Sequence, residues 1–241
     1  MSSLSWTDKY ALETIRKLRD KFDVNFFIET GTWKGVNAAV HSGHFNYVMT
    51  CENNTDVGKT SQKKLDKYGI KVNIMNSVEF LSTIVSSFAL FSQLTPIFYL
   101  DAHFYNTNLS KDKRFVVLDE LKALKGFENC IIIIHDFACE GLGHITYDGI
   151  DLDWNLIGDA LLEVNPNFKL YTNTPEFTDI LTEENVHEVV PEEFLEDAKD
   201  NLRYAWSFPR LTKRGILYAV PRELDLTEYK LKRQKQWEKQ S

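Results

Sequence analysis

The sequence predicts an α/β protein with a Rossmann-like, doubly wound sheet of seven mostly parallel strands, one of them antiparallel, and helices on both faces. Three observations lead to this fold class. Apolar strand-like runs alternate with stretches of helical periodicity between residues 24 and 135. The run Ile131–Ile134 shows no polar alternation, as expected for a strand buried on both faces. A turn with two glycines, Gly31 and Gly35, follows the first apolar run, which is typical of a ligand-binding crevice in such a sheet.

The first half of the chain supplies most of the expected elements. Segment 6–20 carries Ala11, Ile15 and Leu18 at helical spacing, so we expect an amphipathic helix before the first strand. Five strands should follow, at 24–29, 47–51, 71–75, 96–101 and 129–135. Four helices should connect them, at 34–42, 55–68, 77–91 and 112–125.

Beyond residue 150 the pattern is less regular. We expect a helix at 154–164, strands at 168–172 and 214–220, and a surface helix at 225–240. The two strands are separated by roughly forty residues, which is too many for a hairpin turn. Segment 174–211 is therefore either a cap over the site or a peripheral decoration. The whole chain, 1–241, is expected to form one domain.

Composition limits the classes of function. With 43% hydrophobic and 26% charged residues the chain resembles an ordinary globular domain, and its net charge of −7 disfavours a general nucleic-acid binder. The longest purely apolar run, Ile131–Ile134, is too short to span a membrane. The first residues lack the basic and apolar regions of a secretion signal, and the three cysteines show no C-x-x-C spacing. We expect a cytoplasmic protein whose oligomeric state stays open.

Polar residues end all five of the first strands. In parallel sheets ligands bind at the carboxyl ends of the strands, near the point where the strand order reverses. The residues at these ends are Glu29, Glu52, Asn76 with Ser77, Asp101, and His135 with Asp136. The sequence therefore predicts a ligand site rich in acids at this edge of the sheet.

The spacing of Glu52 indicates a nucleoside ligand. It follows Glu29 by 52 − 29 = 23 residues, close to the spacing of about 20 between a glycine turn and an acid that binds a ribose. The alternative is that Glu52 only caps the strand end. The turn lacks the first glycine of G-x-G-x-x-G, and the chain has no phosphate-binding G-x-x-x-x-G-K-[ST] motif. A nucleoside that carries an amino-acid tail and no phosphates fits these features.

These motifs, in this order, resemble those of class I S-adenosylmethionine-dependent methyltransferases. The closer likeness is to the small-molecule O-methyltransferase branch, whose fourth strand often ends D-G-x-H-x-Y and whose fifth ends H-D-F. The resemblance covers residues 24–137, and here Asp101-Ala102-His103 has one residue fewer between acid and histidine than that pattern. The motifs are Glu29–Gly35, Cys51-Glu52, Asn76-Ser77, Tyr99–Tyr105 and Ile133–Phe137.

The resemblance implies a role for each motif. Glu52 would bind the ribose of S-adenosylmethionine, and Asp101 would lie beside the sulfonium and the acceptor. Asn76 and Ser77 would contact the adenine edge. The strands at 168–172 and 214–220 would form the final antiparallel hairpin. Trp33 would either close over the cofactor or pack on the neighbouring helix. The residues expected to line the methionine part are Glu29, Gly31, Thr32, Trp33 and Gly35.

The expected reaction is methylation of a small-molecule hydroxyl, on a sugar or a natural-product intermediate. The hydroxyl must lose a proton, either to His103 or His135 as base, or with help from Mg²⁺ or another divalent ion bound by Asp101 and Asp136. The expected catalytic residues are Asp101, His103, His135 and Asp136. The chain has no N-P-P-[YF] stretch after the fourth strand, which disfavours methylation of nucleobase amines. Two alternatives stay open, a cofactor-binding protein without transfer activity and an NAD-dependent oxidoreductase.

Overall fold

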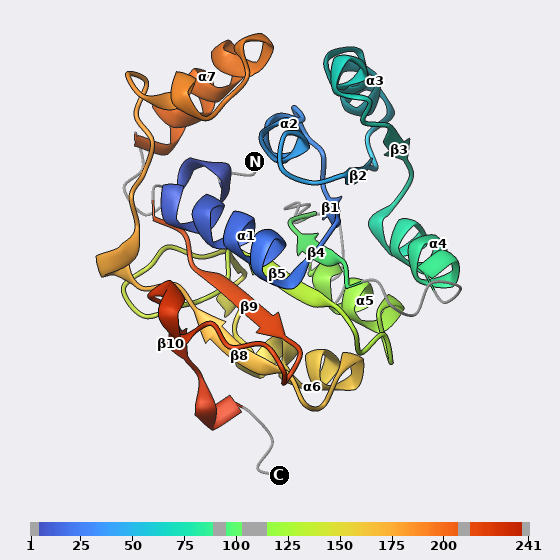
Figure 1. Ribbon diagram of the computed structural model, residues 1–241, viewed down its shortest axis with the longest axis vertical. Coiled ribbons are helices and arrows are strands. Elements are labelled where there is room, and N and C mark those ends of the chain that lie inside the picture. The colour runs from blue at the N-terminus through green and yellow to red at the C-terminus, as the bar shows by residue number, and fades with distance from the viewer. Residues whose placement is uncertain (1–4, 89–94, 103–114, 207–212, 238–241) are drawn as a thin grey trace.

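The computed structural model describes residues 5–88, 95–102, 115–206 and 213–237. Most of its strands belong to one sheet: β1 (Phe26–Thr30), β2 (Tyr47–Glu52), β3 (Val72–Ile74), β4 (Ile97–Leu100), β5 (Ile131–His135), β8 (Lys169–Thr172), β9 (Ile216–Val220) and β10 (Lys232–Arg233). Their order across the sheet is β10-β8-β9-β5-β4-β1-β2-β3 (Figure 1). The described helices are α1 (Lys9–Phe22), α2 (Val36–Ser42), α3 (Thr55–Leu65), α4 (Ser77–Phe88), α5 (Val116–Ala123), α6 (Trp154–Val164) and α7 (Leu195–Trp206).

The sheet confirms the predicted Rossmann-like, doubly wound α/β fold, but its described part has eight strands where seven were predicted, because β10 pairs with β8. Neighbouring strands from β3 to β5 pair in parallel. Strand β9 is antiparallel to both β5 and β8, so β8 again runs in the direction of β5. The strand order reverses between β1 and β4, and ligands of doubly wound sheets bind at the carboxyl ends of the strands at such a reversal. Because β9 is antiparallel, its first residues lie at that same edge.

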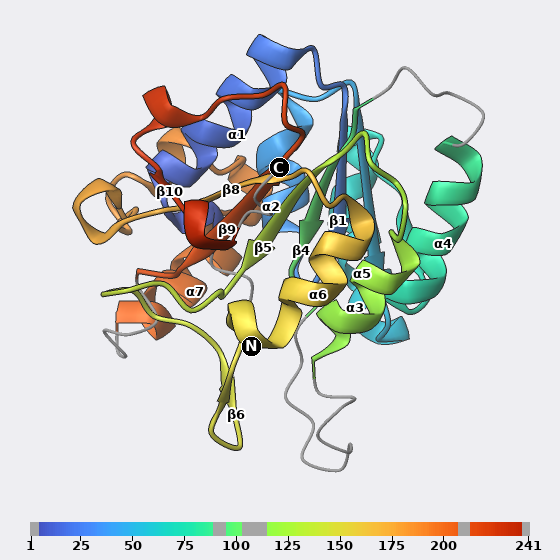
Figure 2. The same ribbon diagram turned by 90° about the horizontal axis from the view of Figure 1, so that it is seen from below.

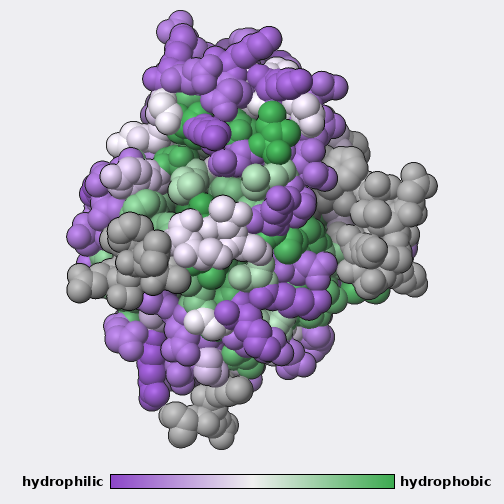
Figure 3. Space-filling view, turned by 90° about the vertical axis from the view of Figure 1, so that its right-hand side faces the viewer, coloured by the Kyte–Doolittle hydropathy of each residue, from purple (hydrophilic) through white to green (hydrophobic). Residues whose placement is uncertain are grey.

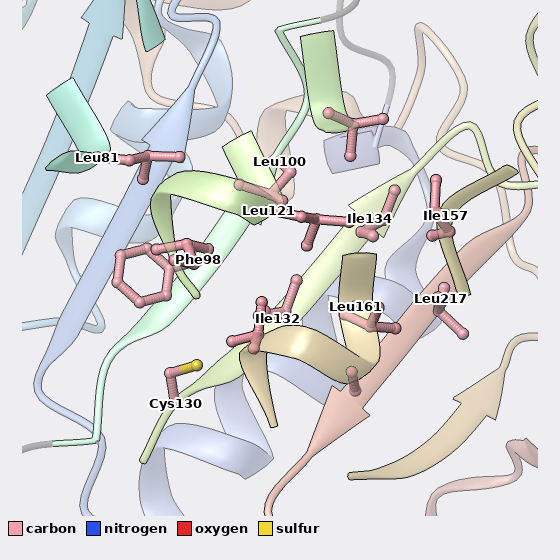
Figure 4. Packing of buried hydrophobic residues seen from close by; sticks show 14 of the residues in the cluster. Leu81, Phe98, Leu100, Leu121, Cys130, Ile132, Ile134, Ile157, Leu161 and Leu217 are labelled. Atoms are coloured by element: carbon pink, nitrogen blue, oxygen red, sulfur yellow. The ribbon is translucent and has the colours of Figure 1, made fainter. Parts of the chain in front are cut away.

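Helices cover both faces of the sheet (Figures 1 and 2). Side chains of β4 alternate between the two layers, which explains why its run is apolar throughout. Phe98 and Leu100 pack with α4, α5 and α6, whereas Ile97 and Tyr99 pack on the side of α1. Figure 4 shows the first layer, where Ile132 and Ile134 of β5 lie among leucines of the covering helices.

The described part of segment 174–211 packs beside the helices that follow the glycine turn. It contains α7 and short 3-10 turns at Pro175–Phe177, Val186–Glu188 and Glu192–Phe194. Its buried side chains form a cluster with residues of α1, α2 and α3, including Leu12, Val36 and Leu65. Asp197 of α7 also forms ion pairs with Lys34 and Lys64. Burial alone would raise the pKa of Asp197, but hydrogen bonds from both lysines lower it.

The tail differs from the helix predicted at 225–240. It forms 3-10 turns at Thr227–Tyr229 and Lys235–Trp237, with β10 between them. Lys230 has a left-handed backbone conformation (φ 58°), which ends the first turn. Strand β10 then pairs antiparallel with β8, and the Gln234 amide donates to Leu170 O over 2.8 Å. Pairing to an otherwise open sheet edge prevails over the helical spacing of the tail's apolar residues.

The opposite edge of the sheet is formed by β3. Figure 3 shows the face that carries α3 and α4, where hydrophilic side chains surround smaller apolar areas. Ile74 of β3 is 41% exposed at this edge. Within the described ranges, no helix combines the length and the apolarity that crossing a membrane requires.

Candidate functional site at the carboxyl edge of the sheet

The glycine turn brings the ends of β1 and β4 into close contact. Gly31 has a φ of 86°, and a Cβ built on it would lie 2.7 Å from Asp101 O. Only glycine meets both conditions, because other residues rarely adopt this φ and would clash with the neighbouring strand. The amides of Gly31 and Thr32 both donate to Cys51 O, which ties the turn to the end of β2. The ends of three strands therefore converge on this turn.

Gly35 places the turn's second half against its neighbours. It precedes α2 with a φ of 81°, and a Cβ there would lie 3.0 Å from Leu65 Cδ1. A side chain at this position would press on the cluster that joins α2, α3 and α7. The spacing of the two glycines thus reflects two separate close approaches, one to β4 and one to α3.

Glu29 lies beneath the turn and is completely buried. Its carboxyl accepts hydrogen bonds from Asn37 Nδ2 (2.7 Å) and Thr50 Oγ1 (2.8 Å), and Thr50 Oγ1 lies 2.7 Å from Thr32 Oγ1. Burial raises the pKa of Glu29 to about 8, although both hydrogen bonds act in the opposite direction. The charges of Asp101 and Glu52 contribute to this rise, so both acids lie within electrostatic reach of Glu29.

Glu52 holds the turn through its backbone. Glu52 Oε2 accepts from the Trp33 amide and Oε1 from the Asn54 amide, each over 2.9 Å. The carboxylate therefore caps the strand end, as the simpler interpretation of the sequence states. A carboxylate offers about four acceptor sites, so these two bonds leave room for ribose hydroxyls.

Trp33 packs toward α3. Its backbone is left-handed (φ 47°), and its carbonyl accepts from Ser61 Oγ. The indole lines a cavity of about 360 Å³ together with residues of α3 and Asp197. Trp33 Nε1 is buried and has no hydrogen-bond partner among the described residues.

Asn76 and Ser77 lie where the chain enters α4 after β3. Asn76 Oδ1 accepts from the Glu79 amide over 2.9 Å, which satisfies one of the free amides of the first helical turn. Ser77 is buried next to it, whereas Asn76 is exposed. This is the geometry of an N-cap.

Asp101, His135 and Asp136 form a buried trio at the ends of β4 and β5. His135 Nδ1 lies 3.4 Å from Asp101 Oδ1 and 3.3 Å from Asp136 Oδ1. Burial would lower the pKa of His135, but the charges of Asp136 and Asp101 prevail and raise it. Asp101 Oδ2 is buried and makes no hydrogen bond with any described residue. An unpaired buried carboxylate oxygen is costly, so a ligand that donates to Asp101 Oδ2 would be stabilised there.

Arg214 is a site residue that our sequence reasoning missed. Its Nη1 lies 3.1 Å from Asp136 Oδ1, and the Arg214 side chain is 7% exposed. Its carbonyl accepts from Asn173 Nδ2 over 2.8 Å. Arg214 was overlooked because it follows Asp136 by 214 − 136 = 78 residues in the sequence. The predicted antiparallel strand could have revealed it, because such a strand begins at the carboxyl edge.

The trio also offers ligand atoms for a metal. One atom from each of Asp101, His135 and Asp136 can be chosen so that all lie within 4.8 Å of one another. The nearby Arg214 guanidinium already neutralises Asp136, and a cation on the same oxygen would be repelled. His103, the other expected base, lies outside the described residues.

Comparisons with known proteins add the following. No family model matches the chain, and no curated protein matches it. Similar solved structures include a SAM-dependent methyltransferase from Archaeoglobus fulgidus, with 13% identity over 88% of this chain and 94% of that one and a TM-score of 0.43. Spermidine synthase from Thermotoga maritima has 9% identity over 92% of this chain and 63% of its own, with a TM-score of 0.48. A phosphoethanolamine N-methyltransferase from Haemonchus contortus, in complex with S-adenosylhomocysteine, has 9% identity over 87% of this chain and 52% of its own. Its TM-score is 0.44.

Proposed function

We propose that the protein is an S-adenosylmethionine-dependent methyltransferase that acts on a hydroxyl of a small molecule. One observation carries this proposal. Asp101 Oδ2 is buried without a partner among the described residues, beside the glycine turn at the strand-order reversal. A ligand with a hydroxyl or ammonium donor would satisfy it. Glu29 lies close enough to Asp101 and to Glu52 for the charge of each to raise its pKa.

Each residue then has a defined task. When bound, the cofactor supplies an activated methyl group on a sulfonium. Glu52 accepts hydrogen bonds from the ribose, while Asn76 and Ser77 border the adenine. Asp101 accepts the proton of the acceptor hydroxyl at Oδ2 as the methyl group is transferred, while His135 Nδ1 lies 3.4 Å from Oδ1 and orients the carboxylate. The charges of Asp136 and Asp101 raise the pKa of His135, which favours the imidazolium as a partner of Oδ1.

The chain's own charges support a reaction without a metal. The Arg214 guanidinium lies 3.1 Å from Asp136 Oδ1 and takes the place that a cation would have in orienting this carboxylate. We therefore expect the chelator-treated protein to show no saturable binding of Mn²⁺ by calorimetry, with Asp136→Asn giving the same trace. Tight Mn²⁺ binding that Asp136→Asn removes would contradict this and would establish Asp136 as a metal ligand.

The assignment of Glu52 to the cofactor can be tested by titration with S-adenosylhomocysteine. A charge-assisted hydrogen bond is worth about 1.5–3 kcal/mol, so Glu52→Ala should weaken binding at least about tenfold. Both amides that Glu52 accepts from lie at the partly open turn, where water can replace it. The control is Glu223→Ala, which should bind like the wild type. Glu223 is an exposed acid that follows β9, at the amino ends of the parallel strands and away from the site. Equal affinities of Glu52→Ala and the control would refute the ribose assignment.

Two other classes are separated by ligand-induced stabilisation. A ligand at 100 times its Kd raises the free energy of unfolding by about 2.7 kcal/mol. An NAD-dependent oxidoreductase would be stabilised by NAD and not by S-adenosylhomocysteine. A cofactor-binding protein without transfer activity would bind S-adenosylhomocysteine, yet give no methylated product with any hydroxylated acceptor.

A further inference from the structure

A second cavity lies beside the trio and has no part in the roles given above. It measures about 580 Å³, within the usual range of about 300–1,000 Å³ for small-molecule sites. Its walls come from the loop after β5, the end of β8, the turn that follows β8, and β10 with the residues after it. These segments lie together at the carboxyl edge of the sheet, on the side of β10.

The cavity is joined to the reaction site by short connections. Ala138 lines the cavity and is two residues from Asp136, so their Cα atoms are at most about 7 Å apart. Asn173, in the opposite wall, donates to Arg214 O and accepts from the Ile216 amide, each over 2.8 Å. Arg214 in turn contacts Asp136. These connections place the Ala138 wall of the cavity near Asp136 at the end of β5.

The wall on the β10 side is a chain of amide and hydroxyl groups. Gln236 Nε2 donates to Gln234 Oε1 over 2.7 Å, and Gln234 Nε2 donates to Thr172 Oγ1 over the same distance. Gln234 and Thr172 are buried, so the chain holds these groups in place. The exposed amide oxygen of Gln236 makes no hydrogen bond with any described residue. Each amide keeps further donor or acceptor capacity toward a ligand.

An aromatic side chain completes the cavity. Trp237 lines it and stacks on Trp154, with ring centroids 5.2 Å apart and planes 3° apart. Phe137 approaches Trp237 at 75° and fixes the indole further. A rigid indole offers a large apolar surface at low entropic cost, next to groups that form hydrogen bonds.

The charges of the walls exclude two ligand classes. Glu140 and Glu176 contribute two carboxylates, and the single ammonium, Lys232 Nζ, lies 3.5 Å from Glu140 Oε2. An anion such as a phosphate would be repelled by the two carboxylates, because the single lysine ammonium cannot offset both. A purely apolar ligand would displace water from the amides and would not replace the hydrogen bonds that they lose. Hydroxyl groups both donate and accept, so they match amides and carboxylates together.

We propose that this cavity is a subsite for a polyhydroxylated, sugar-like group without negative charge, and that it holds the non-reacting part of the acceptor. The assignment of the bound group to an acceptor rests on the proposed function, whereas the binding itself does not. Gln236 and Glu176 would bind hydroxyls, and Trp237 would pack against the C–H groups of the ring.

The test is saturation-transfer NMR with three probes: methyl α-D-glucopyranoside, methyl α-L-rhamnopyranoside and glucose 6-phosphate. At least one methyl glycoside should bind saturably, and glucose 6-phosphate should bind at least fivefold more weakly. Gln236→Ala and Glu176→Ala should each raise the Kd of the bound glycoside at least fivefold. Both residues are exposed, so their thermal midpoints should match the wild type, and Glu223→Ala at the far edge serves as control.

Two outcomes would overturn the proposal: neither glycoside binds, or the cavity variants bind like the control. Titration with S-adenosylhomocysteine is run in parallel on the same samples. Cofactor binding without glycoside binding refutes the subsite alone. Glycoside binding without cofactor binding upholds the subsite and refutes methyl transfer.

Discussion

Glu29 shows how one buried acid depends on its surroundings. The side chain is fully buried, and the pKa of its carboxyl is raised from 4.5 to about 8. Its two hydrogen-bond donors, Asn37 and Thr50, act against this shift but do not outweigh burial. At neutral pH this carboxyl is therefore mainly protonated, so the carboxylates closer to the expected ligand are not faced by a further full negative charge.

This shift predicts a pH-dependent stability. Below pH 4.5 Glu29 is protonated in both the folded and the unfolded chain, so it adds no pH dependence. As the pH rises toward 8, the unfolded chain loses the proton that the folded chain keeps, and the free energy of unfolding falls. Between pH 6 and pH 9 this loss should be about 2–3 kcal/mol. Glu29→Gln cannot titrate and should lack that loss in urea unfolding at the two pH values, and equal losses in both proteins would contradict the shift.

The glycine turn connects the ends of three strands through Gly31, so a substitution there should disturb the packing of whole strands. Gly31→Ala should destabilise the fold by about 2–5 kcal/mol, because a left-handed alanine costs about 1–2 kcal/mol and the contact with Asp101 O adds more. Gly69→Ala is a matched control, since Gly69 has a φ of 67° but no atom within 4 Å of a built Cβ. Gly69→Ala should lower the free energy of unfolding only by the cost of the left-handed alanine, about 1–2 kcal/mol. Equal losses in urea unfolding would show that the close approach of β1 and β4 is unimportant.

The elements differ in how far the sequence predicts them. Strands β1, β4 and β5 were predictable, because burial on both faces leaves unbroken apolar runs that end in acids. The β6–β7 hairpin (Thr146–Tyr147 with Ile150–Asp151) was missed, although Asp148-Gly149 with positive φ values is a typical two-residue turn. The tail was wrongly predicted as a helix because β10 depends on a partner strand more than fifty residues earlier in the chain, 232 − 172 = 60.

The site follows the same division. Glu29, Glu52 and Asp101 could be placed near one another from the strand ends alone, since parallel strands share an edge. Arg214 could not, because its contact with Asp136 depends on the pairing of β9 with β5. The cap at 174–211 also stayed open in the sequence. Its described part packs on α1, α2 and α3 through apolar residues whose spacing alone does not identify their partners.

At the level of the whole molecule, the three apolar clusters are joined by shared elements. Strand β1 contributes Ile28 to the layer beneath α4 to α6 and Phe27 to the layer beneath α1, while Leu12 of α1 belongs to the third cluster. No cluster can lose its packing without disturbing an element that another cluster needs. We therefore expect the chain to unfold as one cooperative unit, so that a local titration changes the global free energy of unfolding.

His41 of α2 provides a measurement of this coupling. It is fully buried against Phe27 and Phe45, and neither ring nitrogen has a hydrogen-bond partner among the described residues. Burial, together with the nearby charges of Arg16 and His44, lowers the pKa of His41 to about 3. In the unfolded chain the ordinary pKa is 6.5, so the unfolded state binds a proton that the folded state refuses between pH 6.5 and pH 3. Stability is thus present above pH 6.5 and is lost as the pH falls.

From pH 7 to pH 5 this group alone should remove about 2 kcal/mol from the free energy of unfolding. His41→Leu keeps an apolar side chain at the site and cannot bind a proton, so its loss over the same pH range should be smaller by that amount. His187→Gln replaces an exposed histidine and should lose as much as the wild type. Urea unfolding followed by circular dichroism and by tryptophan fluorescence should give coincident transitions in all three proteins. A His41→Leu variant as acid-sensitive as the wild type would show that protonation of His41 is not coupled to global unfolding.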